Sequence, residues 1–151
     1  MRRRRSRFRG NALVELAILS SILFPILTGV TQFGYSMYAY NTLQGAVHAG
    51  VRLASVLAYT STTSTPAADY STAVKNTVVY GKPDPQVNGQ GAITDTVVIP
   101  GLTTANVELV ITMNGSEPST VTVRIINFTV DGIFAQYTFN QKPSAMFTFN
   151  G

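Results

Sequence analysis

The feature that most constrains this chain is a long interval without charge. No Asp, Glu, Lys or Arg stands between Glu15 and Arg52, and the first part of the interval is strongly apolar. A helix from Glu15 to Phe33 is about 27 Å long at about 1.5 Å per residue, close to the roughly 30 Å hydrocarbon thickness of a bilayer. We therefore predict a transmembrane helix over about residues 16–40.

Aromatic side chains follow the apolar part of this segment, where an aromatic belt at the far membrane interface is expected. They are Phe33, Tyr35, Tyr38 and Tyr40. Pro25 lies in the middle of the span. Because proline removes a helical hydrogen bond, we expect a kink or local loosening there, which a membrane helix tolerates.

Positive charge is concentrated before the apolar segment. The chain has 11 Lys and Arg residues against 7 Asp and Glu, and residues 1–10 hold six arginines and no acid. The sequence pI of 9.6 therefore reflects this short stretch. Its arginines are not interleaved with contact residues, which argues against a nucleic-acid partner. The positive-inside rule instead places the N-terminus in the cytoplasm.

A secretory signal peptide is the alternative interpretation of the same pattern. The arginines would form its basic region and residues 16–28 its apolar region. The apolar stretch is long for a signal peptide, and no small-x-small cleavage site follows closely. We therefore favour a retained anchor; an exported soluble enzyme or binding module would begin well beyond Tyr35.

An amphipathic helix is predicted to continue beyond the span to about Tyr59. Apolar residues recur at steps of three and four, with polar residues on the other faces: Tyr40, Leu43, Val47, Val51, Ala54 and Leu57. Small residues four apart also allow another backbone to approach closely: Gly45, Ala46, Ala49, Gly50 and Ala54. Either the chain's own domain or neighbouring helices in an assembly pack there, and the sequence leaves both open.

A polar linker at residues 60–66 precedes one small β-rich domain at 67–151. We expect a short helix at 70–75, an extended segment at 77–80, a turn-rich loop at 81–91 and a short strand at 96–99. Residues 106–113 and 120–126 have strand patterns and are predicted to form a hairpin. Residues 128–130 are predicted to extend the second strand, and 136–139 and 145–149 to add edge strands.

These elements predict an α+β fold. A domain of this size buries a modest core, and packing a sheet on the outer half of the long helix would enlarge that core. We therefore expect a long N-terminal transmembrane helix (residues 11–59) packed at its outer half on a small antiparallel β-sheet domain.

The sequence contains few residues of the types that usually act in catalysis. It has no cysteine, which excludes thiol nucleophiles, disulfides and cysteine metal sites. His48 is the only histidine, and its polar helix position favours a solvated or packing role over that of a catalytic base. The acidic residues are scattered without motif spacing. We predict no catalytic residue, no metal site, no cofactor and no enzymatic activity.

The order of residues at the N-terminus is typical of a known class of protein. A type IV prepilin begins with basic residues, a glycine, four further residues, a glutamate and then an apolar helix. This chain has the same order, with Gly10 and Glu15 at the two marked positions. The whole chain resembles a TadE-like pseudopilin of the tight-adherence (Flp, type IVc) pilus system. The first fifty residues carry the most specific part of the resemblance. Further residues that carry it are Phe33 and Gly34 and residues 40–44, 49–52, 73–81 and 98–102.

The resemblance implies a pilin-like fold and a role as a minor pseudopilin or assembly component. A prepilin peptidase would cut between Gly10 and Asn11 on the cytoplasmic side. The implied partners are the membrane, that peptidase, the major pilin and other pseudopilins, and the inner-membrane pilus platform with its secretion ATPase. The implied location is the bacterial inner membrane, with a single pass and an extracytoplasmic C-terminal domain.

Glu15 is expected to act as an assembly residue. Cleavage would create an amine at Asn11, and a carboxylate from an adjacent subunit could neutralise it, relieving an otherwise unpaired charge only on assembly. In the alternative interpretation Glu15 lies among lipid headgroups, close to the arginines. Major pilins usually carry an apolar residue where this chain has Asn11, so N-methylation is less expected than cleavage. A permanently anchored envelope protein with a small binding domain is the alternative function.

Overall fold

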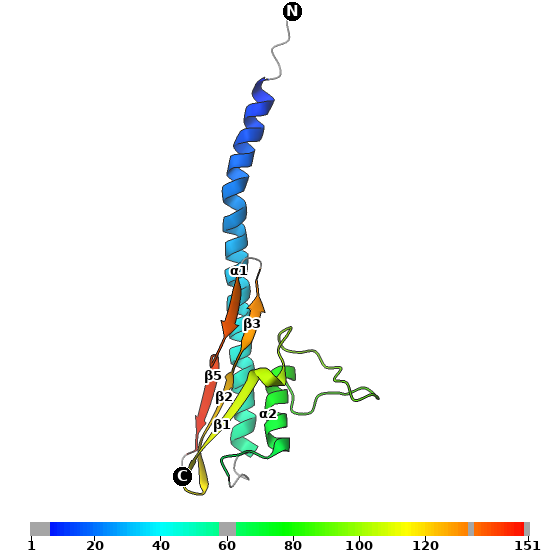
Figure 1. The fold of residues 1–151 in the computed structure, drawn as a ribbon, viewed down its shortest axis with the longest axis vertical. Helices are drawn as coiled ribbons and strands as arrows, with labels where there is room; N and C mark the ends of the chain where they lie inside the picture. The colour runs from blue at the N-terminus through cyan, green and yellow to red at the C-terminus, as the bar shows by residue number, and fades with distance from the viewer. Residues whose placement is uncertain (1–6, 58–62, 133–134, 150–151) are drawn as a thin grey trace, which may run out of the picture.

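The computed structural model describes residues 7–57, 63–132 and 135–149, with side chains from Asn11 onward. Helix α1 (Arg7–Leu57) runs through 51 residues as one element. In Figure 1 its N-terminal half stands clear of the rest of the chain, and its C-terminal half is covered by α2 (Ala68–Tyr80) and by the strands. The predicted α+β fold is confirmed. The predicted helix end near Tyr59 lies outside the described residues.

Three hydroxyl side chains in the apolar half of α1 donate hydrogen bonds to carbonyl groups of the same helix. Ser21 donates its hydroxyl to the carbonyl oxygen of Ile18 at 2.7 Å, and Thr28 and Thr31 donate to carbonyls one turn earlier at 2.8 and 2.9 Å. Such bonds let hydroxyl groups lie in a hydrocarbon environment without an unmet donor. The helix continues through Pro25 without interruption.

The hydrophobic core lies between the C-terminal half of α1, helix α2 and the sheet. The predicted apolar stripe of α1 faces it, with Leu43, Val47, Val51 and Ala54 buried. Other fully buried residues come from α2 and the central strand: Val74, Val78, Val79, Val121, Val123 and Ile125. One long helix therefore supplies a wall of the domain core, as expected from the small size of the domain.

Helix α2 is longer than the sequence suggested. The predicted extended segment at 77–80 is wrong, because these residues form its last turn. β-branched residues favour strands locally, but burial of Val78 and Val79 against the core outweighs that preference. Gly81 ends the helix at φ 76° and donates its N–H to the carbonyl of Thr77 at 3.0 Å.

The turn-rich loop at 81–91 is confirmed, whereas the strand predicted at 96–99 is wrong. The chain there forms bends without a pairing strand. Val98 donates its N–H to the carbonyl oxygen of Val79 at 2.8 Å, and Ile99 is buried. This segment therefore packs on the end of α2, and the short 3-10 helix η2 (Thr104–Asn106) follows it.

The main sheet has three antiparallel strands in the order β1-β2-β5. The predicted hairpin is confirmed as β1 (Val107–Asn114) and β2 (Glu117–Ile125). Its turn is shorter than expected, because only Gly115 and Ser116 connect the strands. Gly115 has φ 68°, as the first central position of a type II′ turn requires. Strand β5 (Ser144–Thr148) pairs with β2 and forms the predicted edge.

A separate two-stranded hairpin lies beside the main sheet. Strands β3 (Phe128–Asp131) and β4 (Gln136–Phe139) pair only with each other, so the prediction that 128–130 extend the second main strand is wrong. Asn127 turns the chain away at φ 49°. The rings of Phe128 and Phe139 then stack 6.4 Å apart, and Phe139 meets Tyr40 of α1 at 6.2 Å. The hairpin is thereby held against α1.

Candidate functional site

The N-terminal half of α1 is an apolar surface that the rest of the chain leaves uncovered. Its large side chains are exposed around the whole circumference of the helix: Leu13, Val14, Leu16, Ile18, Leu19, Ile22, Leu23, Phe24, Ile26, Leu27 and Val30. Within the described ranges α1 alone is long and apolar enough to cross a membrane, and none of its most apolar window is buried. Such a surface is stable only in lipid or among other apolar helices.

Gly10, Asn11 and Glu15 lie together near the start of this surface. All three belong to α1, and Asn11 and Glu15 are four residues apart, which places them on one face of the helix. The Glu15 side chain is exposed. Among the side chains that the structure describes, the ion pairs are Lys82 with Asp95 and Glu108 with Arg124, so Glu15 belongs to neither. A cation from outside this part of the chain can therefore reach it.

The five small residues of α1 divide between two faces. Ala46, Gly50 and Ala54 lie toward the domain core. A Cβ added at Gly50 would be 2.5 Å from Cγ2 of Val78, so this glycine permits the close approach of α1 and α2. Gly45 and Ala49 are exposed, and a Cβ at Gly45 would meet nothing within 4 Å. Only these last two remain available to a neighbouring helix.

A contact that the sequence analysis missed lies where the apolar half of α1 ends. Gln32 is only 7% exposed, and its Nε2 donates to the carbonyl oxygen of Ala135 at 3.2 Å. A Cβ at Gly132 would be 1.5 Å from that Nε2, so the turn of the β3–β4 hairpin rests directly on Gln32. The sequence feature that could have indicated this contact is that Gln32 is the single Asn or Gln within residues 16–40.

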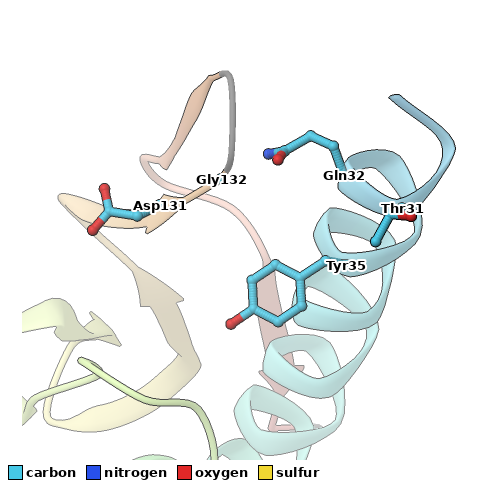
Figure 2. A pocket seen from close by; sticks show the side chains of 5 residues that line it. All are labelled: Thr31, Gln32, Tyr35, Asp131 and Gly132. Carbon is cyan, nitrogen blue, oxygen red and sulfur yellow. The ribbon is translucent and has the colours of Figure 1, made fainter. Parts of the chain in front are cut away.

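A hollow of about 410 Å³ opens beside this contact. It is lined by Thr31, Gln32, Tyr35, Asp131 and Gly132. Figure 2 shows Gln32 and Tyr35 projecting from α1 toward the turn that carries Gly132, while the Asp131 carboxylate points away from α1. Asp131 accepts a hydrogen bond from Nε2 of Gln136 at 2.7 Å. The hollow therefore presents mainly apolar surface.

The predicted aromatic belt is only partly available to a membrane. Phe33 and Tyr38 are strongly exposed, and the ring of Tyr35 stacks on that of Tyr38 at 6.5 Å. Tyr40 is half-buried against Phe139 and contributes to the packing of the domain. Three of the four aromatic residues therefore face outward around the end of the apolar segment.

Tyr70 and Glu108 have shifted pKa values in the folded domain. Tyr70 donates its hydroxyl to the carbonyl oxygen of Ala54 at 2.8 Å, and burial raises its pKa to about 12. The Arg124 guanidinium, hydrogen-bonded to the Glu108 carboxylate at 2.6 Å, holds the pKa of Glu108 below its usual value. His48 is exposed on α1. Among the described residues no group of three or more His, Cys, Asp or Glu could hold a metal ion.

One comparison with known proteins gives a match. Residues 10–52 match the model of the family described as TadE-like protein. The matched segment lies within α1 and includes Gly10, Asn11, Glu15 and the small residues up to Gly50, so the resemblance stated from the sequence is confirmed over these residues. Searches of curated proteins and of solved structures gave no match. The match agrees with a membrane-associated component of a tight-adherence pilus.

Proposed function

We propose, on the basis of the TadE-like match over residues 10–52, that this chain is a minor pseudopilin or assembly component of a tight-adherence, type IV-like pilus. The observation that carries the proposal is that the match coincides with a helix whose first half is apolar and uncovered and whose second half is built into a folded domain. The chain acts by packing against other subunits, without catalysis and without a cofactor.

Membrane anchoring is the first step. The apolar half of α1 spans the bacterial inner membrane, because its exposed side chains lose contact with water there. The arginines of residues 1–10 hold the N-terminus in the cytoplasm by the positive-inside rule. The α2 and β-strand domain then lies on the extracytoplasmic side.

Processing is the second step. A prepilin peptidase cuts between Gly10 and Asn11, which removes all six N-terminal arginines and leaves a positively charged amine on Asn11. The basic segment that fixed the orientation is then gone, and its strong cytoplasmic anchoring is lost with it. The shortened chain can move along the membrane normal into an assembly.

Pairing of Glu15 is the third step. In a single chain this carboxylate stands at the edge of a membrane-length apolar surface, where an unpaired charge is costly. The new amine of a neighbouring subunit supplies the opposite charge. The pair forms only when two helices lie at the correct relative height, so it favours one register of assembly.

Packing of the helices completes the assembly. Gly45 and Ala49 lie on the exposed face of α1, where small side chains allow the helix of a neighbour to approach closely. The neighbours are the major pilin and other pseudopilins, and the inner-membrane platform delivers the subunits.

The deciding experiment is the N-terminal sequence of the membrane-extracted protein. It is compared with and without a co-expressed prepilin peptidase, and for the Gly10→Leu variant. Processing predicts a mature chain that begins at Asn11 only when both the peptidase and Gly10 are present. A chain that still begins at Met1 beside an active peptidase contradicts this step and supports a permanently anchored envelope protein.

A further inference from the structure

The hollow between α1 and the β3–β4 hairpin lies at the height where the uncovered apolar surface of α1 ends. Gln32, one of its lining residues, is about 26 Å along the helix from Glu15 at about 1.5 Å per residue. The hydrocarbon core of a bilayer is roughly 30 Å thick. With Glu15 at one edge of the hydrocarbon, the hollow therefore lies close to the other edge, where acyl chains meet the headgroups.

Two elements far apart in the sequence form the walls of the hollow. Thr31, Gln32 and Tyr35 belong to α1, whereas Asp131 ends β3 and Gly132 begins the turn that follows it. Figure 2 shows the Tyr35 ring reaching from α1 into the space between the two walls. The hydrogen bond from Gln32 to the turn joins the walls, so the hollow is part of the folded domain.

The hollow is lined mainly by carbon atoms because its polar groups are directed elsewhere. The Thr31 hydroxyl donates to the carbonyl oxygen of Leu27 at 2.9 Å. The Asp131 carboxylate accepts from Gln136 and points away from α1. The volume of about 410 Å³ lies within the roughly 300–1,000 Å³ of ligand pockets, which are also mostly apolar. The hollow therefore suits an apolar ligand.

The surface of α1 leads from the hydrocarbon into the hollow. Four residues at steps of four form one row on this helix: Leu23, Leu27, Thr31 and Tyr35. The two leucines are strongly exposed in the apolar half of α1, and the two later residues line the hollow. An acyl chain that lies against the leucines therefore extends directly into the hollow.

Other occupants fit the hollow less well. A neighbouring helix is about 10–12 Å across with its side chains, which is too wide for a space of about 410 Å³. Water needs two to four polar partners to be held in place, and the carbon lining offers few. A thin, flexible hydrocarbon chain meets both restrictions.

We propose that the hollow binds an acyl chain of a membrane phospholipid. This inference rests on the membrane-anchoring step of the proposed function. Among the described lining residues Asp131 carries the charge, so a zwitterionic headgroup such as phosphatidylethanolamine is favoured over an anionic one. The bound lipid attaches the β3–β4 hairpin to the bilayer, in addition to the anchoring that α1 provides alone.

Tryptophan fluorescence of the full-length chain tests this site, because the chain has no native tryptophan. Tyr35→Trp places an indole in the wall of the hollow. Phe33→Trp is the matched control, because Phe33 is an exposed aromatic residue at nearly the same height. Two residues of helix separate the two positions by about 200° around the axis of α1, so the control indole lies on the far side of the helix.

Each tryptophan variant is titrated in detergent micelles with phosphatidylethanolamine that carries bromine near the carboxyl end of one acyl chain. Bromine quenches an indole that it contacts. Burial of two additional methylene groups strengthens binding by about tenfold, so quenching of Tyr35→Trp is expected to saturate at a lipid concentration about tenfold lower than that of Phe33→Trp. Equal titrations of the two variants overturn the proposal.

A second measurement fills the hollow instead of reporting on it. Thr31→Trp places a large side chain in the space, and Thr28→Trp is its matched control. Both threonines donate their hydroxyl groups to carbonyls four residues earlier on α1, but only Thr31 is a lining residue of the hollow. Mass spectrometry of the intact protein released from detergent counts the phosphatidylethanolamine molecules retained.

The retained lipid distinguishes a built site from general adhesion of lipid to the apolar helix. Loss of two methylene contacts weakens binding by about tenfold, so Thr31→Trp is expected to need about ten times more lipid for the same retention, and Thr28→Trp the same amount as wild type. Equal retention by the two variants overturns the proposal, as does a wild-type chain that retains no lipid, since a side chain of a neighbouring subunit is then the better occupant.

The lipid site and the pseudopilin function fail in different ways. Failure of both lipid measurements in a chain that is cleaved after Gly10 overturns the lipid site and leaves the pseudopilin function standing. Lipid bound in the hollow of a chain that still begins at Met1 beside an active peptidase supports the lipid site and contradicts the processing step.

Discussion

Gly50 of α1 and Val78 of α2 are so close that a methyl group on Gly50 would lie 2.5 Å from Cγ2 of Val78. Val78 is fully buried, and its branched side chain has one strongly preferred helical rotamer, so it cannot turn aside. The two helices can maintain their separation only if position 50 has no side chain. This contact joins α1 to α2 within the domain core.

Gly50→Ala is therefore expected to destabilise the domain. Overpacking of a filled core costs about 1–3 kcal/mol, more than the helix propensity that alanine gains. Chemical denaturation of the full-length chain in detergent measures the change. Gly45→Ala is the matched control, because its Cβ would meet nothing within 4 Å. That variant should instead be stabilised by about 0.5–1 kcal/mol, and equal effects at both positions would contradict the assignment of the two faces.

Gly132→Ala is expected to detach the β3–β4 turn from α1. Its Cβ would occupy the place of the Gln32 carboxamide, so the bond from Gln32 to Ala135 breaks, at a cost of about 1 kcal/mol. Hydrogen exchange of the β3 and β4 amides reports the loosening. Gln32→Ala removes the obstacle, so the double variant should be less destabilised than the sum of the two single ones. Strict additivity would show that the two residues do not interact.

Stability is expected to fall in acid through Glu108. Its folded pKa is held low by the hydrogen bond from Arg124. A depressed pKa stabilises the fold above the unfolded value of about 4.3, and this contribution is lost as pH falls toward the lower folded value. The urea midpoint of wild type should therefore decrease from neutral pH to pH of about 3 more than that of Glu108→Gln. Parallel curves would exclude this pair as a source of acid sensitivity.

Tyr70→Phe tests the connection between α2 and the end of α1. It removes the 2.8 Å bond to the Ala54 carbonyl and is expected to cost about 1 kcal/mol. Because the folded pKa of Tyr70 is raised to about 12, its contribution is complete below the unfolded pKa of about 10 and is lost as pH rises between these values. The ultraviolet absorbance titration of wild type should show one tyrosine that ionises late, and the variant should lack it.

Glu15→Ala separates assembly from folding. Glu15 is exposed and far from the core, so the variant should insert and unfold like wild type. Under the pseudopilin proposal its recovery with the major pilin in sheared pili falls sharply, whereas a permanently anchored envelope protein would be unaffected. Val14→Ala, an exposed neighbour on the same helix, serves as the control.

The sequence predicted the elements whose signals are local. The absence of charge from Leu16 to Val51 predicted α1, and alternation with Gly115 at the turn predicted the β1–β2 hairpin. It failed at residues 77–80, where β-branched side chains suggested an extended chain but burial against α1 imposes a helix. It also missed Gln32 and Gly132, because a contact between residues a hundred positions apart leaves no periodic signal.

The candidate site also contains residues that a local sequence pattern identifies and residues that only the tertiary structure can assign. Gly10, Asn11 and Glu15 were identified by their order along the chain, which needs no tertiary information. Spacing alone grouped the five small residues of α1 together. Which of them face α2 depends on where the domain packs, and only the structure separates Gly50 from Gly45.

The continuity of α1 has a mechanical consequence. Since no loop interrupts the helix between its apolar half and the domain core, an axial pull on either half is transmitted directly to the other. Under the proposed topology, the domain is too polar and too wide to follow the helix into hydrocarbon, so it limits how far the helix can be drawn toward its N-terminal side. Motion in the other direction is opposed instead by the exposed apolar side chains of α1, which would have to leave the lipid, so different parts of one helix resist the two directions of pull.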